Sequence, residues 1–202
     1  MISAGDAFVD TQAFSRARAR PLAPEQRRAA ILDSVIPLLK EQGREVSTRQ
    51  LAEAAGVAEG TLFRAFGDKE SIVRAAVERY FDPGPFRDRL RGIDPDDPAE
   101  EKLRQLVGLM RERFEGVIGF VTALGLEQRP PAQPAEEGDW FEILHRMFRP
   151  EELAVPIDTL GFYVRLVAFG SAIPLFNQPH PFETEELVTL IARGVLPGKG
   201  AS

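Results

Sequence analysis

The chain has 202 residues, of which 44% are hydrophobic, and a formal net charge of -6, so it can bury a substantial core as one domain or two small ones. It contains no cysteine, which excludes a disulfide framework, a thiolate metal site and a cysteine nucleophile. The first residues lack a basic segment followed by an apolar one, and no run of about 18 apolar residues occurs, so we expect a soluble cytoplasmic protein without a membrane anchor.

The charge is unevenly distributed along the chain. Basic residues slightly outnumber acidic ones between Arg16 and Asp82, whereas acidic residues predominate from Pro83 onward. This charge balance argues against a protein that coats nucleic acid along its whole surface. The excess of basic over acidic residues lies in the first third of the chain.

The first predicted helix spans about residues 25–42. Its apolar positions recur at helical spacing, Pro24 stands at its start and Gly43 at its end. Pro37 lies inside this pattern and removes one backbone hydrogen bond, so we expect a bend there.

Two short helices are predicted next. Ser47 and Gln50 have the spacing of a capping box, which begins one helix that ends at Gly56. The following helix, about residues 58–65, turns Leu62 and Phe66 inward and ends at Gly67.

Further helices follow as far as the end of the chain. Asp68 is the predicted N-cap of a helix over about residues 69–81, and Asp139 that of another. Long helices are expected over about residues 99–126, 156–176 and 184–196, and no segment has sustained strand alternation. We therefore predict an all-α fold with an N-terminal arm (1–23), a helix-turn-helix domain (24–82) and a C-terminal ligand-binding and dimerisation domain (83–202).

The short helices joined by "AGV" have the form of a helix-turn-helix, in which the second helix enters the major groove of DNA. Gly60 and Thr61 leave its outer face low, so that its backbone can approach the bases while Arg49 and Arg64 reach base edges or phosphates.

The segment "VSTRQLAEAAGVAEGTLFRAFGDKESIVRAAV" resembles the DNA-binding domain of the tetracycline-repressor (TetR) family of transcriptional regulators. The likeness covers about residues 25–82. It implies that Thr48 and Lys69 contact DNA phosphates. The whole set of DNA-facing residues that it implies is Thr48, Arg49, Glu59, Gly60, Thr61, Phe63, Arg64 and Lys69.

Two positions depart from the family pattern. Phe63 stands where the family usually has Tyr and so lacks a hydroxyl for a phosphate, while Ala58 replaces a common Ser and removes a side-chain N-cap. Glu59 has two interpretations: acceptor of a cytosine amine, or simply a favourable charge at a helix N-terminus. The arm from Ser15 to Pro21 is either a disordered tail or a basic arm for the minor groove.

The resemblance also implies a homodimer that binds a palindromic operator and responds to a small-molecule effector. The small residues Gly161, Val164, Ala168 and Ala172 form a stripe that packs either against a second copy or within the subunit.

An apolar effector pocket is expected in the C-terminal domain, and a plain core would have the same composition. Its candidate lining is Met110, Phe114, Val117, Phe120, Val121, Trp140, Phe141, His145, Phe148, Phe162, Tyr163, Leu166 and Phe169.

Other function classes find less support in the sequence. Glu142 and His145 match one Glu-x-x-His element of a di-iron bundle, but such a site needs a second element, and Asn177 stands in its place before His180. We therefore expect no enzymatic activity, no metal and no cofactor. The family resemblance implies that such a DNA-binding regulator is a repressor. The alternative is an interaction protein that has kept the helix-turn-helix fold and lost DNA binding.

Overall fold

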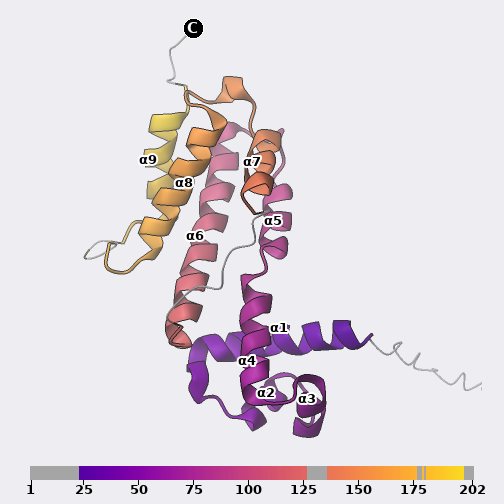
Figure 1. Ribbon diagram of the computed structural model, residues 1–202. Helices are drawn as coiled ribbons and strands as arrows, with labels where there is room; N and C mark the ends of the chain where they lie inside the picture. The colour runs from indigo at the N-terminus through magenta and orange to yellow at the C-terminus, as the bar shows by residue number, and fades with distance from the viewer. Residues whose placement is uncertain (1–22, 127–135, 177–178, 180, 198–202) are drawn as a thin grey trace, which may run out of the picture.

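Nine α-helices and no strand form in the computed structural model, which describes residues 23–126, 136–176, 179 and 181–197 (Figure 1). The all-α prediction is therefore confirmed. The elements are α1 (Pro24–Gln42), η1 (Gly43–Glu45), α2 (Thr48–Ala54), α3 (Glu59–Phe66), α4 (Lys69–Phe81), α5 (Gly84–Arg91), α6 (Ala99–Ala123), α7 (Glu136–Met147), η2 (Pro150–Glu152), α8 (Ile157–Ala172) and α9 (Thr184–Val195).

Local capping fixes the short helices of the N-terminal unit. The Ser47 backbone N–H donates to Gln50 Oε1 at 2.9 Å and the Gln50 N–H donates back to Ser47 Oγ at 3.2 Å, which confirms the predicted capping box. Asp68 Oδ1 accepts from the Ser71 N–H at 2.7 Å and begins α4. As expected, α3 begins after Ala58 without a side-chain cap.

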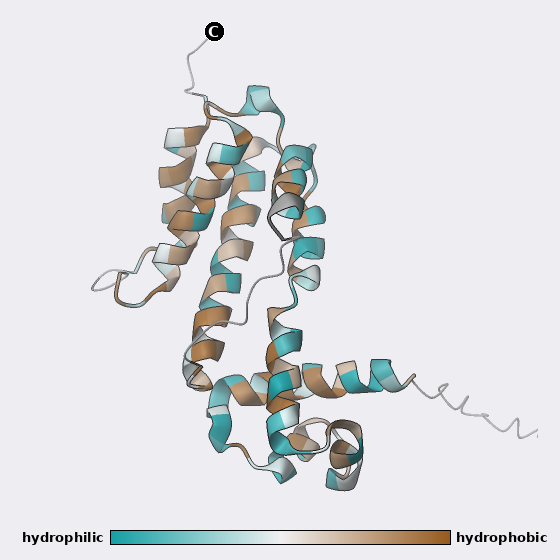
Figure 2. Ribbon diagram, viewed as in Figure 1, coloured by the Kyte–Doolittle hydropathy of each residue, from teal (hydrophilic) through white to brown (hydrophobic). Residues whose placement is uncertain are grey.

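Two clusters of buried side chains divide the molecule into a lower unit, α1 to α4, and an upper unit, α5 to α9 (Figure 1). Helix α6, with 25 residues, runs through both. Its C-terminal residues Phe120 and Leu124 belong to the core of the lower unit, and Figure 2 shows hydrophobic colouring along the helices where they face one another. The core of the lower unit is thus completed by residues far beyond position 82.

Close contacts join the end of α6 to the lower unit. Arg44 Nε donates to the Leu124 backbone oxygen at 2.9 Å, and Arg113 Nη1 donates to the Tyr80 backbone oxygen at 2.9 Å. Gly43 has a φ of 61°, and a Cβ on it would collide with the Ala123 backbone oxygen. Glycine is therefore required at this position both by its backbone conformation and by the approach of α6.

Two predicted helix boundaries are wrong. Asp139 is not an N-cap, because α7 begins at Glu136, and its carboxylate instead pairs with Arg87 at 2.8 Å. The helix expected to continue to residue 176 ends at Ala172, because Pro174 pushes Ile173 out of the helical region, to a ψ of 116°.

One charged side chain is fully buried among the described residues. The side chain of Lys102 has no exposed surface. Its Nζ donates to both carboxylate oxygens of Glu152 at 2.8 and 2.9 Å and to the Pro95 backbone oxygen at 3.0 Å. It also lies over the ring of Phe148. These partners satisfy all three of its N–H donors.

No helix within the described ranges is long and apolar enough to span a bilayer.

Candidate nucleic-acid interface

The inner face of helix α3 packs into the core of the lower unit. Leu62 is fully buried and Phe66 nearly so, and Arg28 of α1 donates to the Ala65 backbone oxygen and lies 4.4 Å from the centroid of the Phe66 ring. The turn before α3 passes through Gly56, which has a φ of 63°. Sequence reasoning missed Arg28, because its contact joins residues 37 positions apart and leaves no local pattern.

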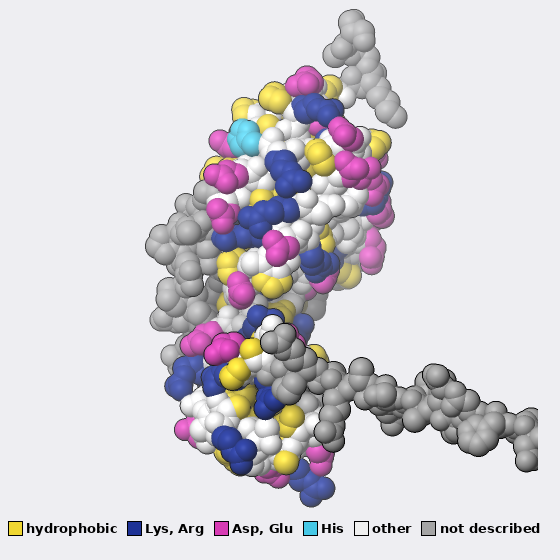
Figure 3. Space-filling model, turned by 90° about the vertical axis from the view of Figure 1, so that its right-hand side faces the viewer, with side chains coloured by type: hydrophobic (Ala, Val, Ile, Leu, Met, Phe, Trp, Pro, Cys, Tyr) yellow, Lys and Arg dark blue, Asp and Glu magenta, His cyan; other side chains and the backbone are white. Residues whose placement is uncertain are grey.

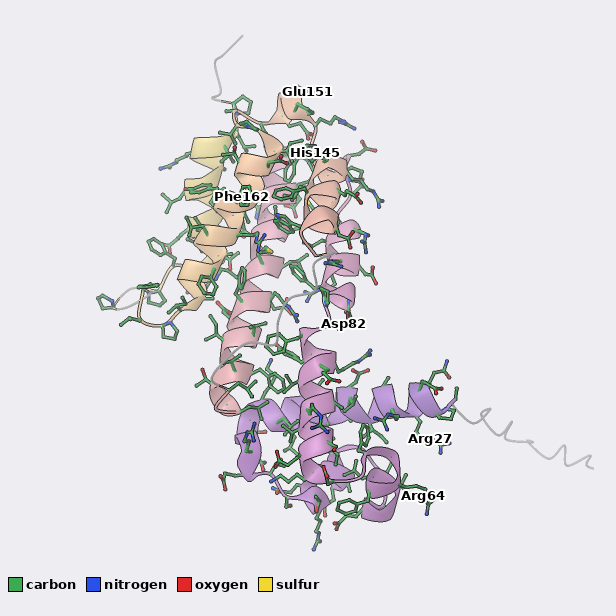
Figure 4. The ribbon with its side chains drawn as sticks, in the orientation of Figure 1. Arg27, Arg64, Asp82, His145, Glu151 and Phe162 are labelled. Carbon is green, nitrogen blue, oxygen red and sulfur yellow. The ribbon has the colours of Figure 1, made fainter. Side chains whose placement is uncertain are left out.

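The opposite side of α3 is open. Glu59, Gly60 and Arg64 are exposed, and a Cβ placed on Gly60 would meet no atom within 4 Å. Figure 4 shows Arg64 projecting outward from the helix. Thr61 is half-buried, whereas Phe63 exposes 39% of its surface. A helix with a buried inner face and a low outer face is what close approach to a groove requires.

The other predicted contact residues lie at the beginnings of α2 and α4, and each has a partner within the protein. Thr48 Oγ1 donates to Glu59 Oε2 at 3.2 Å, and Arg49 Nε donates to Glu53 Oε1 at 2.9 Å. Lys69 Nζ donates to the Arg44 backbone oxygen at 2.7 Å. The structure therefore brings the predicted residues together around three helix beginnings and adds Arg44 to them.

Electrostatics around this surface are local. The hydrogen bond from Arg49 to Glu53, with the negative charge of Glu53, raises the pKa of Arg49 above its usual value. Hydrogen bonds from the Ser71 backbone and side chain lower the pKa of Asp68. On the face that Figure 3 shows, Lys and Arg side chains of the lower unit are interspersed with Asp and Glu and do not form one continuous basic patch.

The predicted pocket residues do not meet in one place. Phe120 is buried and packs 4.5 Å from the Tyr80 ring in the lower core, with Val117 and Val121 beside it. A second set packs in the upper core: Met110, Phe114, Trp140, Phe141 and Phe148. His145 is exposed, and its Nε2 lies 2.9 Å from Asp158 Oδ1 (Figure 4).

The remaining pocket candidates lie on the exposed side of α8, where the ring centroid of Phe162 is 5.2 Å from that of Phe141 and the ring centroid of Phe169 is 5.3 Å from that of Phe114. Phe162, Tyr163, Leu166 and Phe169 are exposed on α8, so within one subunit they do not line an interior pocket. Most of α8 is apolar, and periodicity alone could not decide which of its faces is buried.

The small-residue stripe of α8 is the face that packs inward. Gly161, Val164, Ala168 and Ala172 are all buried within the subunit, and a Cβ on Gly161 would approach the side chains of Leu144 and Trp140. Of the two alternatives for this stripe, packing within the subunit is therefore the one that the structure supports. The exposed apolar side chains of α8 are bulky ones.

The described residues contain no cluster of three or more His, Asp or Glu side chains that could hold a metal ion. Glu142 is exposed on α7, while Asn177 and His180 lie outside the described residues, as does the arm from Ser15 to Pro21.

The chain is similar to known proteins in both sequence and fold. Residues 31–76 match the family model for bacterial regulatory proteins, tetR family. The chain is 39% identical over 51 residues to the HTH-type transcriptional regulator YvkB of Bacillus subtilis, a match covering 25% of this chain and 27% of that protein. It is 28% identical over 100 residues to the HTH-type transcriptional repressor KstR2 of Mycolicibacterium smegmatis, covering 48% and 46%.

These matches span less than half the length of either relative. Over the whole fold, the crystal structure of the TetR transcriptional regulator SCO0520 from Streptomyces coelicolor is similar, with a TM-score of 0.57, 20% identity and coverage of 85% of this chain and 99% of that one. Residues 31–76 therefore have the sequence of the DNA-binding segment of the tetR family of bacterial regulatory proteins, and the course of the helices along the chain is similar to that of a TetR transcriptional regulator.

Proposed function

We propose that the chain is a dimeric transcriptional regulator that binds a palindromic DNA operator through α3 and acts as a repressor. The observation that carries this proposal is the open outer face of α3 around Gly60, set above the buried Leu62 and Phe66. The names of the relatives YvkB and KstR2, an HTH-type regulator and repressor, support it.

In this proposal, Arg64 and Arg49 reach base edges or their flanking phosphates, and Lys69 contacts a phosphate. Arg64 is exposed and has no hydrogen bond or ion pair with the described residues. Lys69 can keep its bond to the Arg44 backbone oxygen while binding DNA, because an ammonium group has three N–H donors. The hydrogen bond to the Arg44 backbone oxygen then orients the Lys69 side chain and leaves N–H donors for the phosphate.

Dimerisation would join the exposed apolar sides of α8 and α9 to those of a second copy. Phe162, Leu166 and Phe169 of α8 expose 60, 70 and 45% of their surfaces, and Leu190 of α9 exposes 50%. An exposed set of large apolar side chains is typical of a protein interface. Two copies are needed because one recognition helix contacts few base pairs, and a two-fold dimer addresses two half-sites.

The effector would be a small apolar or amphipathic molecule bound in the upper core near Met110, Phe114 and Phe141. Trp140 supports this location, because its Nε1 is buried without a hydrogen-bond partner in the described structure. Binding would shift the population between arrangements of the dimer that match or mismatch the operator. The proposal includes no catalytic step, and action on operator DNA places the protein in the cytoplasm.

The experiment that tests the proposal is footprinting on DNA that flanks the protein's own gene, together with selection from a random duplex library. We expect protection of two half-sites about one helical turn apart. Equal affinity for every duplex, or none, would overturn the proposal and favour an interaction protein that no longer reads DNA. Compounds that abolish the footprint would then identify the effector class.

A further inference from the structure

A single hydrogen bond joins the first residues of the two helix-turn-helix helices. Thr48 Oγ1 at the start of α2 donates to Glu59 Oε2 at the start of α3 at 3.2 Å. Glu59 is exposed, and no Lys or Arg among the described residues forms an ion pair with it. The nearby cation Arg49 is instead bonded to Glu53. Glu59 is therefore an oriented carboxylate with most of its acceptor capacity unfilled.

A carboxylate on a surface that meets DNA is repelled by phosphates unless it accepts from a donor on a base edge. In the major groove those donors are the N4 amine of cytosine and the N6 amine of adenine. The major-groove edge of adenine carries an N7 acceptor beside the amine, which disfavours a group that can only accept, whereas the major-groove edge of the cytosine base itself carries the amine and no acceptor. The chemistry of Glu59 thus favours cytosine.

We propose that Glu59 reads one cytosine amine in each half-site of the operator and that Thr48 is its positioning residue. This inference rests on the proposed function, because it names the base that the same surface recognises. It changes the role expected for Thr48. A hydroxyl has one proton, so while Thr48 donates to Glu59 it cannot also donate to a phosphate. The position of Glu59 at the N-terminus of α3 also favours its negative charge, but that effect does not require Thr48.

The test is selection of operators from a random duplex library by the full-length wild type and by Glu59→Gln, followed by titration of single-base variants. The wild type should select cytosine at one position of each half-site, and exchange of that base should weaken binding by about 5- to 100-fold. Glu59→Gln should select adenine there, because a Gln amide both donates and accepts. All other positions should be unchanged.

Thr48 is tested by Thr48→Val, which removes the hydroxyl at nearly constant shape, and by Thr48→Ser, which restores it. Thr48→Val should lose most of the discrimination at the cytosine position, and Thr48→Ser should recover it. Weakening of all sequences by one common factor would instead identify Thr48 as a phosphate anchor and overturn its positioning role.

Glu78→Gln is the matched control, because it removes the same charge from an exposed site more than two turns beyond Lys69 on α4. It should leave the selected sequence unchanged. If the wild type and Glu59→Gln select the same palindrome, this inference is overturned and the proposed function stands. A wild type that selects no sequence would overturn both.

Discussion

Lys69, at the start of α4, is tied to Arg44: its Nζ donates to the Arg44 backbone oxygen at 2.7 Å. The guanidinium of the same Arg44 donates to the backbone oxygen of Leu124, just beyond the end of α6, at 2.9 Å. One residue of η1 therefore lies between a proposed phosphate contact and the helix that runs through the upper unit. A displacement of the end of α6 would reach Lys69 through Arg44.

Arg44→Ala should free the C-terminal end of α6 from the lower unit. Because the guanidinium is half exposed, its bond to Leu124 should contribute only about 1 kcal/mol to the free energy of unfolding. We expect faster amide hydrogen exchange over residues 120–126, measured by mass spectrometry on the free protein. Arg74→Ala, which removes an exposed arginine of α4, is the control and should leave that exchange unchanged. Equal amide hydrogen exchange over residues 120–126 in the two variants would contradict a role of Arg44 in holding the end of α6 to the lower unit.

Lys69→Ala should weaken binding to all DNA sequences alike. Loss of one phosphate contact reduces the slope of log affinity against log salt concentration by about 1. Titrations at several salt concentrations measure this slope. Arg193→Ala on α9 removes the same charge far from α3 and should retain the wild-type slope. A lowered slope in both variants would show that net charge, and not a contact at Lys69, is responsible.

Leu166→Glu should convert the proposed dimer into a monomer. Leu166 is 70% exposed within one subunit, so the change costs the subunit little, but burial of a carboxylate against a second copy is strongly unfavourable. We expect the dimer dissociation constant to rise by at least about 100-fold, which light scattering coupled to gel filtration measures.

Arg146→Glu, on the exposed side of α7, is the control for this variant and should remain dimeric. Operator affinity should fall together with the dimer. A Leu166→Glu protein that stays dimeric would place the interface elsewhere.

Sequence reasoning predicted the lower unit better than the upper one, for a physical reason. The beginnings of α2 and α4 depend on residues within three positions of each other, such as Ser47 with Gln50 and Asp68 with Ser71. Such short-range chemistry is visible in a single sequence.

What the sequence analysis left open or predicted wrongly mostly concerns relations between distant residues, although the early end of α8 before Pro174 is a local effect. Both the small stripe containing Gly161 and the bulky one containing Phe162 recur at helical spacing on α8, and only the packing of α6 and α7 decides which is buried. Of the eight predicted DNA-facing residues, Arg49, Gly60, Thr61 and Arg64 follow from the helix-turn-helix pattern, and the resemblance to a known domain adds the other four. The pairing of Thr48 with Glu59 spans 11 positions and needed the fold.

Lys102 and Glu152 provide a last prediction, on stability. Because Lys102 is fully buried and Glu152 mostly so, Lys102→Ala would leave a carboxylate without its cation and should lower the free energy of unfolding by about 3 to 5 kcal/mol. Denaturant titration measures the loss. Glu151→Gln, at the exposed neighbouring position, is the control and should change stability by less than about 0.5 kcal/mol.

The same pair predicts a pH dependence. Burial acts to raise the pKa of Glu152, but the backbone N–H of Arg149 and the ammonium of Lys102 outweigh it, so the pKa is lowered from 4.5. A lowered pKa in the folded state means that the stabilisation is complete above about pH 4.5 and is lost as the pH falls through the folded value. Glu152→Gln should therefore be less stable than the wild type at pH 7, and the difference should shrink below pH 4.5. A difference that stays constant down to pH 3 would show that the charge of Glu152 does not contribute to folding.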